Sequence, residues 1–173
     1  MFITRKDVNI SGLNTQDIIK IFRGETATCP DGKRIRLILR PSTETDTLLL
    51  KKISPEVSNA VDTALSRDGM LMAITDQECL DLIEKTSGGF GFATLTQTIS
   101  EKRPLKILPF NGLTPSLKTL SEGSYPLSKP LYFVIKPEFS VLVRKFIDFV
   151  RSSEGRKILE ESGNLVVIGR SGK

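Results

Sequence analysis

The sequence predicts an α/β protein in which helices flank a mixed, mostly parallel sheet. Short apolar runs that suit strands alternate with longer segments of helical periodicity along the chain. Many of the helical segments begin at a capping residue and end at a glycine, so their limits can be predicted. Because parallel strands need long connections, which are usually helical, this alternation favours a largely parallel sheet.

Capping residues and periodicity define the expected elements in order. We expect one helix from Asn14, with Asp17 as its third residue, to Gly24, and another that begins at Ser54-Pro55-Glu56. The other elements of the first half are a strand over 35–40, a helix from about 47, a buried strand over 70–74 and a helix that a capping box at 75–78 opens and Gly88-Gly89 closes. The elements of the second half are strands over 90–94, 105–110 and 130–135, helices over 114–123, 138–150 and 153–163, and a candidate final strand over 165–168.

The composition excludes several classes of function. The 173 residues include 25 Lys and Arg, 20 Asp and Glu and no histidine, which excludes Ser-His-Asp and Cys-His catalysis and His-ligated metal sites within this chain. No run approaches the roughly 18–20 apolar residues of a membrane span, and Met1–Asp7 lacks the apolar core of a signal peptide. The net charge of +5 suits a small anionic ligand. Without a concentrated basic patch or an aromatic RNA-binding motif, we expect no nucleic-acid partner.

The first candidate site follows the strand at 35–40, where a helix begins. The candidate binding residues of this junction are an arginine, an acid and four hydroxyl side chains: Arg40, Ser42, Thr43, Thr45, Asp46 and Thr47. Helix N–H groups, hydroxyls and a guanidinium are the donors that an oxyanion needs. Ser, Thr and Asp also favour helix starts, so simple capping is the alternative. Glu44 and Asp46 disfavour a dianion unless Arg40 neutralises them, and from these residues alone both interpretations stay open.

The second candidate site is the junction at Thr75 and Asp76, after the strand at 70–74. Here Glu78 completes a capping box, which makes a structural role the stronger interpretation. The Gly88–Gly91 run comes after a helix and before a strand, the reverse order from a phosphate-binding loop, so we expect it to end the helix. No pair of acids suits general acid–base catalysis. We therefore expect no enzyme activity, no metal and no cofactor.

Four stretches carry a family resemblance: SGLNTQDIIKIFRGE at 11–25, TSGGFGF at 86–92, YPLSKPLY at 125–132 and FIDFVRSSEG at 146–155. Taken in this order, they resemble the phosphate-binding-protein-like substrate-binding proteins of ABC transporters, which have the type II periplasmic-binding-protein fold. The resemblance implies a solute-binding component of an ABC-type uptake system that binds phosphate or a related small oxyanion without covalent chemistry. It also implies a periplasmic or extracytoplasmic location and a transporter permease as partner.

The resemblance further implies a division of the chain. Residues 1–130 correspond to the second lobe of such a protein, and residues 131–173 to a return strand and C-terminal helices that pack on a first lobe. The start of that first lobe has no counterpart in this sequence, and the apolar surface that it would cover could drive self-association.

The resemblance also bears on the ligand. The family's phosphate loop reads Arg, a short spacer and Ser-Gly-Thr at a helix start, which corresponds here to Arg40 and Thr45-Asp46-Thr47. Asp46 in place of glycine leaves phosphate and a differently shaped oxyanion both open. The alternative function is a sensor or interaction domain that uses the same fold without transport.

Overall fold

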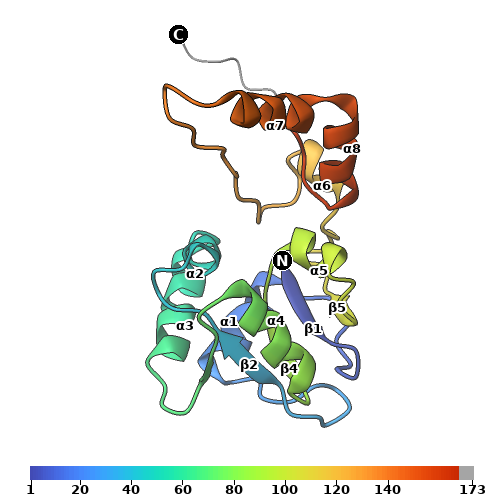
Figure 1. Cartoon of the computed structure of the whole chain (residues 1–173). Coiled ribbons are helices and arrows are strands. Elements are labelled where there is room, and N and C mark those ends of the chain that lie inside the picture. Colours follow the sequence, from blue (N-terminus) through green and yellow to red (C-terminus); the bar gives the residue numbers. More distant parts are fainter. Residues whose placement is uncertain (168–173) are drawn as a thin grey trace.

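The computed structural model of the chain describes residues 1–167 and contains a five-stranded sheet with helices around it (Figure 1). The strands are β1 (Phe2–Arg5), β2 (Arg36–Leu39), β3 (Leu71–Met72), β4 (Gly89–Phe92) and β5 (Leu105–Ile107). The helices are α1 (Thr15–Arg23), α2 (Thr45–Lys51), α3 (Pro55–Leu65), α4 (Asp76–Lys85), α5 (Leu95–Ser100), α6 (Leu117–Ser121), α7 (Val141–Arg151) and α8 (Ser153–Glu161). No helix among these residues is long and apolar enough to cross a membrane.

The sheet is mixed, as the sequence predicts, with two parallel and two antiparallel strand pairings. Its strand order is β3-β2-β4-β1-β5, in which β2 pairs in parallel with β3 and β4, and β1 pairs antiparallel with β4 and β5. Four strands therefore run in one direction and β1 runs against them. α4 packs on β4, β1 and β2, and α1 packs against α3.

The strand β1 was not expected from the sequence, although it lies inside the sheet. Its residues Phe2, Ile3 and Thr4 are fully buried, and Ile3 lies opposite both Gly91 and Ile107. The Thr4 hydroxyl donates to the carbonyl oxygen of Gly89 at 2.7 Å. A four-residue strand whose side chains are buried on both faces shows no polar–apolar alternation, so periodicity could not reveal it.

Most helix starts follow the caps that the sequence predicts. Asn14 and Asp17 form a capping box at α1, and Ser54 caps α3 through the backbone N–H of Val57. Four details differ. α5 was not expected, α2 begins at Thr45 rather than at about 47, α6 begins after Ser116 rather than at Thr114, and α7 begins after Ser140 rather than at 138.

The Gly88 turn links α4 to β4, as expected of a helix end rather than a phosphate loop. Gly88 has φ +75°, and a Cβ atom at this position would collide with the carbonyl oxygen of Arg34. The turn therefore needs glycine both for its backbone conformation and for the close approach of the neighbouring chain.

Three strand predictions were wrong. β3 has two residues instead of a buried run over 70–74, and Leu71, Met72 and Ile74 are exposed at the sheet edge. Residues 130–135, the most strand-like run in the sequence, form no strand, and within residues 1–167 the structure gives residues 131–135 no backbone hydrogen bond. Residues 165–167 also form no strand, and residue 168 lies outside the described part of the chain. A run of residues with high β-propensity forms a strand only where a neighbouring sheet edge supplies its hydrogen-bond partners.

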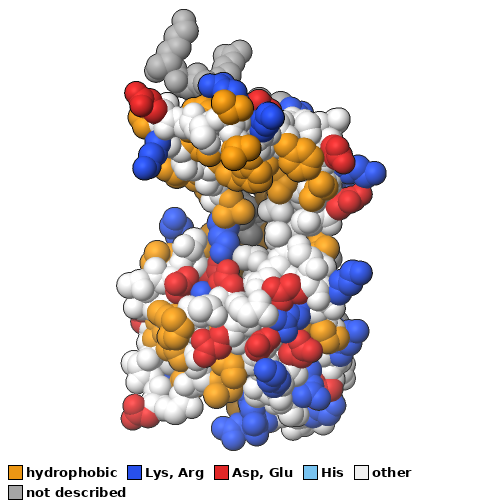
Figure 2. All heavy atoms as spheres, in the orientation of Figure 1, with side chains coloured by type: hydrophobic (Ala, Val, Ile, Leu, Met, Phe, Trp, Pro, Cys, Tyr) orange, Lys and Arg blue, Asp and Glu red, His pale blue; other side chains and the backbone are white. Residues whose placement is uncertain are grey.

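Residues 128–167 form a separate layer beyond the sheet. Figure 1 shows α7 and α8 side by side at some distance from the sheet, joined to it by the chain around α6. This layer exposes many large apolar side chains, with Tyr132 81% and Val134 94% exposed, and Figure 2 shows an apolar area on it. Two side-chain hydrogen bonds connect it to residues 1–127 within the described chain: Thr96 to Asn164 at 3.0 Å and Lys129 to Asp46 at 2.6 Å.

Candidate functional site

Arg40 lies at the carboxyl end of β2 and joins the two predicted junctions. Its side chain is only 5% exposed, and its Nη2 atom lies 2.8 Å from Asp76 Oδ1 and 3.2 Å from Glu44 Oε2. Nη1 donates to the carbonyl oxygen of Ala73 at 3.4 Å, whereas the buried Nε has no hydrogen-bond partner in the described structure. We call residues 40–47 together with Thr75 and Asp76 the Arg40 junction.

The start of α2 is not capped by a side chain. Glu44 occupies the N-cap position but makes no side-chain cap hydrogen bond, in contrast to every other helix described here. The Thr47 hydroxyl donates to the Arg40 carbonyl oxygen at 3.2 Å. The exposed hydroxyls of Ser42, Thr43 and Thr45 have no hydrogen-bond partner among residues 1–167. The capping interpretation therefore does not account for these hydroxyls, and the helix start keeps free N–H donors.

Asp46 is buried in the first turn of α2 and has a partner far along the chain. Its side chain is 3% exposed, and its Oδ1 accepts a hydrogen bond from Lys129 Nζ at 2.6 Å. Lys129 was missing from the residues predicted for this site. It lies inside the YPLSKPLY stretch, but nothing in the sequence indicates which acid it meets.

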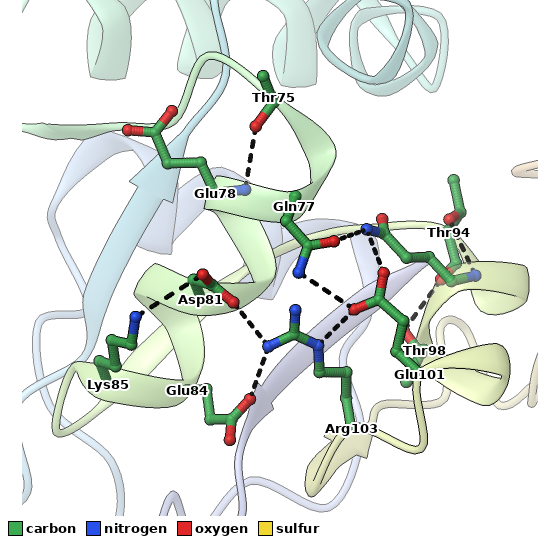
Figure 3. Close-up of polar contacts among 11 residues, drawn as sticks. Thr75, Gln77, Glu78, Asp81, Glu84, Lys85, Thr94, Thr98, Glu101 and Arg103 are labelled. Carbon is green, nitrogen blue, oxygen red and sulfur yellow. Dashed lines mark hydrogen bonds and ion pairs between the residues drawn. The ribbon is translucent and has the colours of Figure 1, made fainter.

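Thr75 and Asp76 have different roles at the start of α4. Thr75 Oγ1 accepts a hydrogen bond from the Glu78 backbone N–H at 3.1 Å, which is the predicted cap (Figure 3). The Glu78 carboxylate accepts a hydrogen bond from the backbone N–H of Ile74 at 2.7 Å, rather than from that of Thr75. Asp76 instead holds Arg40, so the second junction supports the first.

A cluster of charges around Arg103 fixes α4 against the end of α5. Its Nη1 lies 2.6 Å from Asp81 and 3.1 Å from Glu84, and its Nε lies 2.6 Å from Glu101 (Figure 3). The hydrogen bond from Arg103 lowers the pKa of Asp81. Hydrogen bonds from Gln97 and then Arg103 lower the pKa of Glu101. The cluster therefore ties α4 to the segment after α5, and within residues 1–167 it shares no ion pair with the Arg40 junction.

We expect this cluster to make stability depend on pH. Carboxyl groups with lowered pKa values stabilise the folded state above their unfolded pKa values, and this contribution is lost as the pH falls through the folded values. Chemical denaturation between neutral pH and pH 3 should show the free energy of unfolding of the native chain fall in acid. Arg103→Met should be less stable at neutral pH and show a smaller fall. Parallel pH curves for the two proteins would contradict this assignment.

The part of the chain that the structure describes offers no internal chamber for a ligand at this junction. The cavity beneath Arg40, Asp46 and Thr47 measures about 20 Å³ and is otherwise lined by apolar side chains. A space of this size holds about one water molecule. A ligand would therefore bind on the open side of the junction, where the free hydroxyls lie.

Residues 1–167 contain neither a cluster of metal-binding side chains nor a reactive cysteine. No group of three His, Cys, Asp or Glu residues there could hold a metal ion. Both cysteines are free and buried, and burial raises the pKa of Cys79 to about 12. A thiol with that pKa is not a nucleophile at neutral pH.

Comparison with known proteins relates the chain to phosphate-binding proteins. It is 29% identical to the phosphate-binding protein PstS of Borreliella burgdorferi over 95% of this chain and 62% of that protein. The crystal structure of PstS from Borrelia burgdorferi superposes with a TM-score of 0.62 at 26% identity, covering 94% of this chain and 66% of that one. The chain thus spans less than two thirds of the length of these relatives.

A more distant structure shares the fold with a higher TM-score. A phosphate ABC transporter substrate-binding protein from Clostridium perfringens, solved with bound phosphate, superposes with a TM-score of 0.73 at 17% identity and covers 94% of this chain and 65% of that one. The family model described as the PBP superfamily domain matches residues 1–154. Because this match covers most of the chain, the chain belongs to the PBP superfamily.

Proposed function

We propose that the chain is part of the solute-binding component of an ABC-type uptake system and binds phosphate or a related small oxyanion at the Arg40 junction. The observation that carries this proposal is the buried Arg40 guanidinium, with an unpartnered Nε, beside exposed hydroxyls that lack protein partners. The names of the relatives support the ligand class. Thr75 acts by capping α4, and Ser42, Thr43, Thr45 and the first-turn N–H groups are the proposed donors.

Arg40 is arranged to bind an anion without moving far. Asp76 holds one edge of the guanidinium, which fixes its orientation, whereas Glu44 is 41% exposed and can turn into solvent. An oxyanion that replaces Glu44 would meet a preoriented guanidinium, so little side-chain entropy is lost on binding. The mechanism is non-covalent capture, completed when the first lobe closes over the open side of the junction.

Thermal unfolding with a panel of anions tests the ligand class. We expect phosphate, or one of sulfate, molybdate, tungstate and small carboxylates, to raise the Tm of this chain. A ligand at 100 times its Kd adds about 2.7 kcal/mol of stability, which corresponds to roughly 5–10 °C for a domain of this size. Phosphate titrations followed by amide chemical shifts extend the measurement to weak binding. The absence of any response at the Arg40 junction would contradict the proposal.

Replacing Arg40 separates binding from folding. We expect Arg40→Met to weaken anion binding by about tenfold to a hundredfold, because a charge-assisted hydrogen bond contributes about 1.5–3 kcal/mol. Arg103→Met is the matched control, since it also removes an arginine held by carboxylates but lies away from the junction. It should lower stability and leave the anion affinity unchanged. Equal loss of affinity in both variants would show that the effect is structural.

The partners and the location follow from the same proposal. We propose that residues 1–130 form a lobe, that residues 131–173 pack on a first lobe, and that the complete protein delivers its ligand to a transporter permease outside the cytoplasm. The apolar side chains exposed on residues 131–149 support such packing. In the chain by itself, we expect the same surface to cause self-association.

A further inference from the structure

The Arg40 junction contains the two charged side chains that are buried within residues 1–167, Arg40 and Asp46. Burying a charge is costly unless it is paired. Arg40 finds its partners nearby, in Glu44 and Asp76. Asp46 takes its partner from Lys129, 83 residues further along the chain. The buried Asp46 carboxylate is therefore paired only by a residue from outside the strand-to-helix segment that forms the junction.

Lys129 lies where the chain leaves the lobe. It follows the buried Leu127 and precedes the exposed run at 131–135, and its side chain is 25% exposed. Its ammonium group reaches a carboxylate in the first turn of α2, the turn in which Thr45 and Thr47 flank Asp46. The contact thus joins the segment that leaves the lobe to the surface proposed for the anion.

The charges at the junction give this contact a role in binding. The junction holds three carboxylates: Glu44 and Asp76 pair with Arg40, and Asp46 pairs with Lys129. Glu44 and Asp76 are partly exposed and screened by water, whereas Asp46 is not. A buried carboxylate a few ångströms from a bound anion repels it strongly in a low-dielectric surrounding. Lys129 is the cation placed to cancel that repulsion.

We propose that Lys129 is a positioning residue of the anion site, which neutralises the buried Asp46 carboxylate and so permits an anion to bind at the start of α2. This inference rests on the proposed function. It assigns opposite effects on the affinity for the anion to two residues that contact each other: Asp46 lowers the affinity, and Lys129 cancels that effect. A purely structural ion pair would instead make both residues equally necessary.

A double-mutant cycle measured with inorganic phosphate tests the assignment. The amide chemical shifts of residues 45–47 would be followed during phosphate titration at constant ionic strength, in the native chain and in Lys129→Met, Asp46→Asn and the combined variant. We expect Lys129→Met to bind phosphate about tenfold more weakly and Asp46→Asn to bind at least as tightly as the native chain. In the Asp46→Asn background, Lys129→Met should have an effect of about twofold or less.

Two further variants control for charge and for folding. Lys136→Met removes a positive charge from the same exposed segment and should change the phosphate affinity by less than about twofold. Lys129→Arg keeps the charge and should bind as the native chain does. Asp46→Asn removes the buried charge and should fold, so it still tests the assignment if Lys129→Met does not fold.

The outcomes separate this inference from the proposed function. Equal loss of affinity in Lys129→Met and Asp46→Asn would overturn the role of Lys129, as would a Lys129→Met variant that binds like Lys136→Met. In both cases the native chain would still bind phosphate, and the proposed function would stand. No chemical-shift response in any variant, including Asp46→Asn, would overturn the two together.

Discussion

Replacing Phe2 by alanine should lower the free energy of unfolding by about 3–5 kcal/mol, the range found when a buried aromatic side chain is removed from a core. Phe2 is fully buried, and its ring lies 6.1 Å from that of Phe90 and 5.1 Å from that of Phe110, measured between ring centroids. These contacts link β1 to β4 and to the segment after β5. The cavity left by the truncation would therefore weaken the centre of the sheet, and urea denaturation measures the loss.

The matched control for this prediction is Phe133→Ala. Phe133 contacts Phe146 but is exposed, so its truncation removes little buried area. We expect a change of about 1 kcal/mol or less. Similar losses for Phe2→Ala and Phe133→Ala would show that residues 128–167 contribute to the same cooperative core, against the layered arrangement in Figure 1.

The second large effect is expected at the exposed face of α7. Leu142 is 75% exposed, and Phe146 is also exposed on the same helix. We expect Leu142→Gln combined with Phe146→Gln to weaken self-association of the chain by at least about a hundredfold, because burying each such side chain contributes about 1.5–3 kcal/mol. Sedimentation velocity over a concentration series measures the association constant.

Leu48→Gln combined with Ile99→Gln provides the control for that experiment. These two side chains are also large, apolar and exposed, but they lie on α2 and α5 rather than on α7. They should leave the association constant nearly unchanged. A native chain that stays monomeric at high concentration would refute the prediction, and a fall in both double variants would mean that the surface responsible is not α7.

The starts of the helices were predictable because their signals are local. Asn14, Ser54 and Thr75 cap α1, α3 and α4 through hydrogen bonds to backbone groups three residues away. Such a bond depends on neighbouring residues and on little else. The same locality allowed the Gly88 turn to be recognised as the end of a helix.

The strands were less predictable because each needs a partner that the local sequence does not specify. Residues 130–135 have high β-propensity and remain without a sheet edge, whereas the short β1 is held between β4 and β5. The comparison shows that pairing, rather than propensity, decides which apolar run becomes a strand.

The candidate site also combines features that the local sequence predicts with features that depend on tertiary packing. The sequence by itself determined that Arg40 and a group of hydroxyls stand together at the start of a helix, since they are adjacent in the chain. Only the tertiary structure decided that Asp76 holds Arg40 and that Lys129 reaches Asp46. A buried charge takes its partner from whichever segment packs beside it, and that choice is set by the tertiary packing rather than by the residues nearby in the sequence.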